Sequence, residues 1–245
     1  MAIDFCPGSM KFRSPEPEEI KCSSCGHKVE IWTDEIQITC PKCKNKILRL
    51  KEGGNCLDWC KAAERCVGKE VYQTYKQNKA ITTKDKLLKE LEDYFGEDQK
   101  RINHAKKVLG FAEDLLREGK SDWHIVVPAA ILHDVGIKAA LEKYGSSAGN
   151  LQEKEGPQVA RKILLKAGLP KADIEEICAI IAHHHSPGKI NTQNFKVLYD
   201  ADWLVNLRDE ADIKDKSKLN QIIDKIFLTS TGKELAKKIY LLDEN

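Results

Sequence analysis

The sequence lacks the features that would place the protein in a membrane, in a secretory pathway or on nucleic acid. Its longest apolar run, Ile125–Leu132, is far shorter than the roughly 20 residues that cross a bilayer. The first residues show no basic region followed by an apolar core, so we expect no signal peptide. A net charge of only +2 predicts no general affinity for nucleic acid. We therefore expect a cytoplasmic protein that does not bind membranes.

Cysteine, by contrast, is abundant, and eight of the nine cysteines lie within residues 1–70. In a reducing compartment such cysteines predict metal ligands rather than disulfides. Two Cys-x-x-Cys motifs, Cys22–Cys25 and Cys40–Cys43, each direct two sulfurs towards one point, and four thiolates complete a tetrahedral zinc site. Short alternating segments between the motifs predict β-strands. We predict structural zinc, in a domain like a zinc ribbon or rubredoxin, at Cys22, Cys25, Cys40 and Cys43.

A second cysteine group predicts a further metal site. Cys56 and Cys60 are one helical turn apart and can share a face. Cys66 needs a turn or loop to join them, and Cys6 is the cysteine left unassigned in this region. Four thiolates here would bind either zinc or an iron–sulfur cluster. The alternative is that these thiols pack as small apolar residues in a helix.

Beyond residue 70 the pattern is helical. Residues 71–97 predict a helical connector whose apolar positions fall on one face. From residue 98 to 245 apolar residues recur at helical spacing. We predict a mainly α protein in three parts: a cysteine-rich metal-binding domain with short strands (1–70), the connector (71–97) and a helical bundle (98–245).

The pair His133-Asp134 follows an apolar helical run, and we expect Gly136 to end that helix. Near a helix end an imidazole and a carboxylate can converge on a metal ion. Taken alone, the pair is equally consistent with local capping or hydrogen bonding. His104 upstream and Asp202 downstream, both on expected helices, change that balance.

The order His104, His133-Asp134, Asp202 resembles the HD-domain family of metal-dependent phosphohydrolases over roughly residues 98–208. The resemblance implies an HD-type helical bundle in which these four residues bind a divalent ion: Mn, Fe, Co, Ni or Zn, with Mg possible. It implies hydrolysis of a phosphate ester of a nucleotide or related small molecule, by a water that the ion activates. Asp134 would serve as general base. Asp200, two residues before Asp202, is a candidate to orient a ligating histidine.

Several cations are candidates for contacting the substrate phosphate, Arg208 among them. Arg101 lies one turn before His104, where a phosphate contact and a surface salt bridge are equally consistent with its position. Many family members have Gly-Lys directly after the His-Asp pair. Here Ile137 intervenes between Gly136 and Lys138, and Lys138 is still a candidate.

Family branches with two metals use a His-His pair that corresponds to the run 183–185. We assign the second ion to His183 and His184, with the register open by one residue; the alternative is that these imidazoles bind phosphate or lie exposed at a helix end. Those branches also carry a histidine before the glycine equivalent to Gly156. Residues 152–155 contain none, and Glu153 is the candidate substitute. Residues 144–150 form a polar, glycine-bearing loop, a candidate lid.

Two other functions compete with hydrolysis. The bundle could sense a nucleotide without turnover while the cysteine-rich domain contacts a nucleic acid or protein partner. It could also be a di-iron oxygenase, as some HD relatives are, although the missing histidine before Gly156 argues against a full two-metal set.

Overall fold

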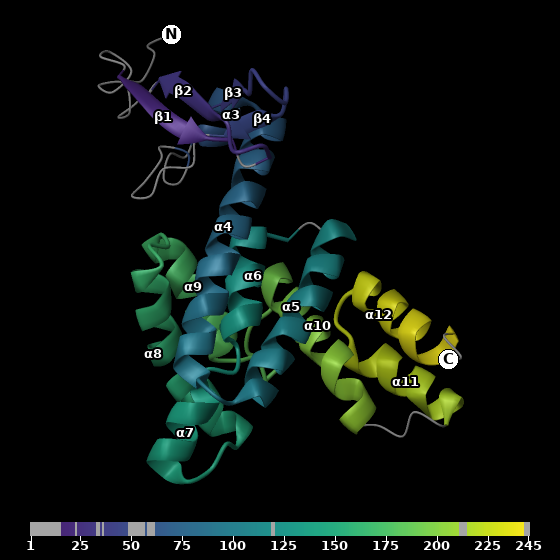
Figure 1. Cartoon of the computed structure of the whole chain (residues 1–245). Helices are drawn as coiled ribbons and strands as arrows, with labels where there is room; N and C mark the ends of the chain where they lie inside the picture. The colour runs from purple at the N-terminus through teal and green to yellow at the C-terminus, as the bar shows by residue number, and fades with distance from the viewer. Residues whose placement is uncertain are drawn as a thin grey trace. The chain divides into compact units, whose positions relative to one another are not determined.

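The computed structural model describes residues 16–22, 24–32, 35, 37–48, 57, 62–118, 121–210 and 215–242. The chain divides into two compact units, Met1–Tyr75 and Lys76–Asn245, whose elements are labelled in Figure 1. The first holds short strands and the second is built from helices. The mainly α fold preceded by short N-terminal strands is therefore confirmed.

Two antiparallel hairpins form the described sheet structure of the first unit. Strand β1 (Pro17–Lys21) pairs with β2 (Lys28–Trp32), and β3 (Gln37–Thr39) pairs with β4 (Lys46–Leu48). Each hairpin closes over one Cys-x-x-Cys motif. The unit thus repeats strand, cysteine turn, strand. A short helix, α3 (Ala63–Val67), follows.

The two cysteine turns share one backbone design. In the first, the Gly26 N–H donates to the Cys22 carbonyl at 2.8 Å; in the second, the Lys44 N–H donates to the Cys40 carbonyl at 3.0 Å. Gly26 and Lys44 have positive φ angles of 69° and 63°. A left-handed residue is therefore needed directly after each Cys-x-x-Cys, and glycine supplies it only in the first turn.

A single long helix, α4 (Lys69–Phe95), covers most of the stretch expected to be a helical connector. It begins in the first unit and ends in the second. Leu87, Leu91 and Phe95, one turn apart, are buried in the core of the second unit. The predicted apolar face therefore anchors the end of α4 to the bundle.

The second unit is a bundle built around α6 (Trp123–Leu132) (Figure 1). Residues Ile125–Leu132 are all buried, and α6 packs against three neighbouring helices. The stretch Trp123–Tyr144 is apolar and long enough to cross a membrane, but 78% of its most apolar window is buried inside the fold, as in a core helix. The other elements are α5 (Gln99–Glu118), α7 (Gly136–Tyr144), α8 (Gly149–Lys166), α9 (Lys171–Ile181), α10 (Gln193–Glu210), α11 (Lys216–Ile226), α12 (Ser230–Lys237) and the π-helical turn η1 (Lys238–Leu242).

Gly136 does not end a helix, contrary to our expectation. Helix α6 ends at Leu132, and Gly136 is the first residue of α7. A Cβ at Gly136 would collide with the backbone of α8, at the carbonyl oxygen of Gln152 and at the Gly156 nitrogen, 2.8 Å away. Glycine is required here because α7 and α8 pack backbone to backbone, two residues after Asp134.

Candidate metal centres

The four cysteines of the two turns form one cluster. Cys22 Sγ lies 3.6 Å from Cys43 Sγ, Cys25 Sγ lies 3.7 Å from Cys40 Sγ, and all four sulfurs are within 4.8 Å of one another. Four sulfurs at about 2.3 Å from a tetrahedral ion are about 3.8 Å apart, so the spacing fits a metal and is too long for disulfides. That this metal is zinc stays a prediction.

The backbone of the first turn favours a thiolate. Burial raises the pKa of Cys22, but hydrogen bonds from the N–H groups of Ser24 and Cys25 outweigh it and lower the pKa to about 6. The second predicted cysteine site cannot be compared in this way. Its residues, Cys6, Cys56, Cys60 and the side chain of Cys66, lie outside the described residues.

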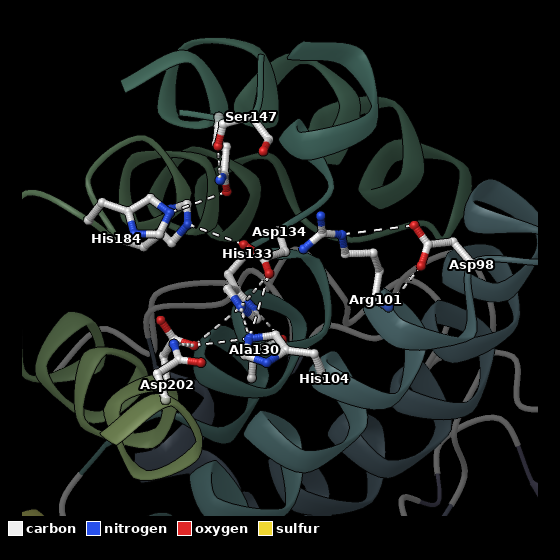
Figure 2. A network of polar contacts seen from close by, with 12 residues as sticks. Asp98, Arg101, His104, Ala130, His133, Asp134, Ser147, His184 and Asp202 are labelled. Atoms are coloured by element: carbon white, nitrogen blue, oxygen red, sulfur yellow. Dashed lines mark hydrogen bonds and ion pairs between the residues drawn. The ribbon is translucent and has the colours of Figure 1, made fainter. Parts of the chain in front are cut away.

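Three separate elements of the second unit bring the His-Asp residues together (Figure 2). His104 lies on α5, His133 and Asp134 lie on the turn between α6 and α7, and Asp202 lies on α10. The Nε2 atom of His104 is 3.1 Å from Asp202 Oδ1 and 3.3 Å from His133 Nε2. Asp134 Oδ2 is 3.5 Å from His133 Nε2 and 3.6 Å from His104 Nε2. His104, His133 and Asp134 thus place one ligand atom each within 4.8 Å of one another, and Asp202 Oδ1 lies beside the two imidazoles.

The hydrogen bonds of two histidines fix which nitrogen faces that cluster. His133 Nδ1 is 2.8 Å from the Ala130 carbonyl, and His184 Nδ1 is 2.7 Å from the Ile181 carbonyl. A carbonyl only accepts, so each Nδ1 carries a proton, and in the neutral ring Nε2 presents a lone pair. His184 Nε2 is buried, has no hydrogen-bond partner among the described residues and faces Asp134 Oδ1 at 3.6 Å. A cation between these atoms would satisfy both, so the donor set fits a divalent metal.

The charges within the cluster are mutually stabilising. Burial alone would raise the pKa of Asp134, but the imidazoles of His133, His184 and His104 outweigh it and hold the pKa well below its usual range. Burial lowers the pKa of His104 and of His184, yet the neighbouring carboxylates of Asp202 and Asp134 raise both above the ordinary value. A divalent ion binding here would displace these protons.

Comparison with known proteins decides the family. A family model described as HD domain matches residues 101–226. The chain belongs to the HD domain family. A crystal structure described as a predicted HD superfamily hydrolase, from an uncultured Thermotogales bacterium, is 22% identical, with a TM-score of 0.48 over 64% of this chain and 84% of that one. A comparison with curated proteins finds no match. Family and donor set together support a metal-dependent hydrolase.

The histidine run joins the HD centre one residue later than we assigned it. His184 and His185 each place a nitrogen within 4.8 Å of a carboxylate oxygen of Asp134, and His183 belongs to neither histidine–aspartate group. The sequence carried a signal for the right register, because His184 continues the buried stripe of Ile177 and Ile181 at helical spacing.

Lys138 and Arg101, two of the cations proposed to contact the substrate, occupy different positions relative to the HD centre. Lys138 does not reach the HD centre: its Nζ donates to the Tyr94 carbonyl at 2.8 Å and lies over the Tyr94 ring. Arg101 stays beside the centre, and its charge opposes the rise in the pKa of His104. Its Nε is also 3.9 Å from Asp98 Oδ2, so the ion pair and the position near the centre coexist (Figure 2).

Two acidic side chains differ from their expected roles. Asp200 orients no histidine; it accepts hydrogen bonds from Leu228 N at 2.7 Å, Thr229 N at 2.8 Å and Thr229 Oγ1 at 2.6 Å. Glu153, the candidate substitute for a histidine, accepts instead from the His185 N–H at 3.0 Å and the Ser186 hydroxyl at 2.9 Å. Asp200 therefore holds the segment before α12, and Glu153 holds the histidine turn.

Two amide side chains at the centre were missed. Asn206 Nδ2 donates to Asp202 Oδ1 at 2.9 Å from one turn further along α10. The four-residue spacing of Asp202 and Asn206 was a readable signal. Gln152 on α8 places Oε1 3.2 Å from His185 Nε2. No sequence pattern marks Gln152, because its position depends on the packing of α8 against α7.

Proposed function

We propose that the protein is a metal-dependent phosphohydrolase that cleaves a phosphate ester of a nucleotide or a related small molecule. The observation that carries the proposal is the division of the Asp134 carboxylate: one oxygen faces His104 and His133, and the other faces His184. A carboxylate shared between two sets of imidazole donors suits chemistry on an ester whose attacking and leaving oxygens both need charge stabilisation.

A divalent ion bound by His104, His133, Asp134 and Asp202 would supply a Lewis acid and lower the pKa of a bound water towards neutral. The protein contributes placement. The Asn206 amide holds Asp202 Oδ1, and the Ala130 carbonyl holds the His133 ring. Asp134 Oδ1 faces His184 rather than the first set of donors, and can accept the proton of an attacking water.

Arg101 supports an anionic substrate. Its guanidinium lies beside His104, with 28% of the side chain exposed. A partly buried guanidinium can donate two parallel hydrogen bonds to phosphoryl oxygens and neutralise charge that develops on them. This residue would therefore bind the phosphate group that the centre hydrolyses.

The test uses the full chain loaded with Mn²⁺ or Co²⁺ and measures phosphate release from nucleoside mono-, di- and triphosphates and from p-nitrophenyl phosphate. We expect Asp134→Asn to lower kcat/KM by about 100-fold or more, because it weakens both sets of donors. Arg101→Ala should lower kcat/KM by at least about tenfold. Arg117→Ala, on the same helix but paired with Asp114, is the matched control and should change nothing. Nucleotide binding without phosphate release from any substrate would overturn the proposal and favour sensing.

A further inference from the structure

A tyrosine from outside the HD match holds the turn that carries Asp134. Tyr94 lies in the last turn of α4, before the matched range begins at residue 101. Its hydroxyl donates a hydrogen bond to the Val135 carbonyl at 3.1 Å. Val135 is fully buried, so this carbonyl cannot turn to water, and a buried carbonyl without a partner is costly. The bond therefore fixes the backbone one residue after Asp134.

Helix α7 returns the contact through Lys138. The Nζ atom of Lys138 donates to the Tyr94 carbonyl at 2.8 Å and lies 5.1 Å from the centroid of the Tyr94 ring. Carbonyls in the last turn of a helix lack partners within that helix, and the helix dipole favours a cation beside them. Tyr94 thus holds the start of α7, and Lys138 holds the end of α4. This reciprocal pair of hydrogen bonds joins the two helices next to the His-Asp pair.

The Tyr94 hydroxyl is held in place and stays a donor. Its ring packs edge-on against the buried Phe95, with ring centroids 5.2 Å apart. Burial and the carboxylate of Glu142 raise the pKa of Tyr94 above its ordinary value of about 10, although the Ala139 N–H opposes them. The hydroxyl therefore keeps its proton throughout the neutral pH range and can donate to the Val135 carbonyl.

The position of the Asp134 carboxylate depends on this backbone. Its Oδ2 atom lies 3.5–3.6 Å from two imidazoles, and its Oδ1 atom lies 3.6 Å from a third. Misplacement of a catalytic group by about 1 Å costs about 100-fold in rate. The α8 backbone, packed against Gly136, limits movement of this segment by exclusion alone. The Tyr94 hydroxyl adds an attractive contact to the residue before that glycine.

We propose that Tyr94 is a positioning residue of the HD centre, which sets the place of Asp134 through the Val135 carbonyl. The inference rests on the proposed metal-dependent function, and it adds a residue that touches neither the ion nor the substrate. Helix α4 thereby takes part in the centre, although it lies outside the family match. Lys138 contributes by holding Tyr94 and not by binding the phosphate.

The experiment compares Tyr94→Phe with Tyr240→Phe in the full chain, with Zn²⁺ loaded at the cysteine site. Each change removes one hydroxyl that donates to a backbone carbonyl and keeps the ring. The Tyr240 hydroxyl donates to the Leu204 carbonyl at 2.6 Å, inside the continuous helix α10, so this variant is the matched control. Equilibrium dialysis measures the affinity for Mn²⁺, and urea unfolding measures stability. Hydrolysis of p-nitrophenyl phosphate at saturating Mn²⁺ separates kcat from KM.

We expect Tyr94→Phe to weaken Mn²⁺ binding by about tenfold and to lower kcat, with KM unchanged because Tyr94 does not contact the substrate. Lys138→Met should weaken Mn²⁺ binding less, again without a change in KM. Tyr240→Phe should unfold at lower urea concentration than the wild type and bind Mn²⁺ equally well.

A merely structural role predicts that Tyr94→Phe loses stability and keeps the wild-type affinity for Mn²⁺, and that result would overturn the proposal. Equal losses of affinity in Tyr94→Phe and Tyr240→Phe would overturn it too. If the wild type binds Mn²⁺ but releases no phosphate from any substrate, the proposed function alone fails, because the ratio of affinities still tests Tyr94. A wild-type chain that binds no ion at the HD centre would overturn both.

Discussion

Asp134 Oδ1 and His184 Nε2 face each other at 3.6 Å, and the ring proton of His184 is already committed to the Ile181 carbonyl. The other oxygen of Asp134 faces His133 at 3.5 Å. One carboxylate thus lies between two sets of imidazoles: His104 and His133 on one side, and His184, from a later part of the sequence, on the other. The two sets should respond separately to mutation.

His184→Ala and His183→Ala form the sharpest pair for the histidine register. His184→Ala removes a buried donor that faces Asp134, so we expect the full chain to lose one divalent ion or to bind it about tenfold or more weakly. His183→Ala, one residue away but outside both groups, should bind metal as the wild type does. Elemental analysis after dialysis measures both. Equal losses in the two variants would contradict the register described here.

Gly136→Ala and Gly110→Ala test the backbone contact between α7 and α8. A methyl group at Gly136 meets the α8 backbone, so we expect a loss of about 1–3 kcal/mol in the free energy of unfolding and weaker metal binding at the adjacent Asp134. Gly110 lies inside α5 with nothing within 4 Å of an added Cβ. Its replacement should instead stabilise by about 0.5–1 kcal/mol. Urea unfolding measures the free energy of unfolding of both variants. An unchanged value in Gly136→Ala would refute the contact.

Lys44→Gly should strengthen the cysteine site. Lys44 has the left-handed conformation that Gly26 adopts in the first cysteine turn, at a cost of about 1 kcal/mol for a residue with a Cβ. The change should raise the chelator concentration needed to strip the cysteine-bound metal. Gly26→Ala should lower it through backbone strain, since no atom of the described residues lies within 4 Å of an added Cβ at Gly26. A chelator titration followed by a colorimetric zinc indicator gives both midpoints.

The buried Glu155 gives a prediction about pH. Hydrogen bonds from the Tyr144 hydroxyl at 2.7 Å and from Lys143 Nζ at 3.0 Å lower the pKa of Glu155. A carboxyl whose pKa is lowered in the folded state stabilises above its unfolded pKa of about 4.3, and this contribution is lost as pH falls through the folded pKa. We therefore expect wild type to be more stable than Glu155→Gln at pH 7, and the difference to shrink as pH falls below about 4.3 and on through the lowered folded pKa.

Urea unfolding at a series of pH values provides the measurement. Glu118→Gln, an exposed change on α5, is the control and should give no such pH-dependent difference. A difference between wild type and Glu155→Gln that stays constant down to pH 3 would show that the ionised carboxylate is not what stabilises the junction of α7 and α8.

The parts of the site that could be predicted from sequence are those fixed by local spacing. The two Cys-x-x-Cys motifs bring their own sulfurs together through a turn, and the ordered set from His104 to Asp202 marks the family. His184 could also have been placed, since it extends the buried stripe of α9.

The remaining features depend on contacts between elements. Lys138 is held by the last turn of α4, and the side chain of Gln152 is oriented by the carbonyl of Ser147. Gly136 must be glycine because the backbone of α8 leaves no room for a Cβ. None of these partners lies within one helical turn of the residue it constrains. Spacing along the chain therefore could not reveal these contacts. The analogy with Gly-Lys in relatives placed Lys138 at the substrate phosphate, whereas its Nζ donates to the Tyr94 carbonyl.

The Asp200 hydrogen bonds have a practical consequence for anyone who shortens this protein. The HD match ends at Ile226, and the donors to Asp200 are Leu228 and Thr229, just beyond it. A chain cut at the family boundary would keep every expected metal ligand yet leave the fully buried carboxylate of Asp200 without those donors, two residues from Asp202. Such a fragment would understate the metal affinity of the intact protein, so an expression boundary belongs after η1.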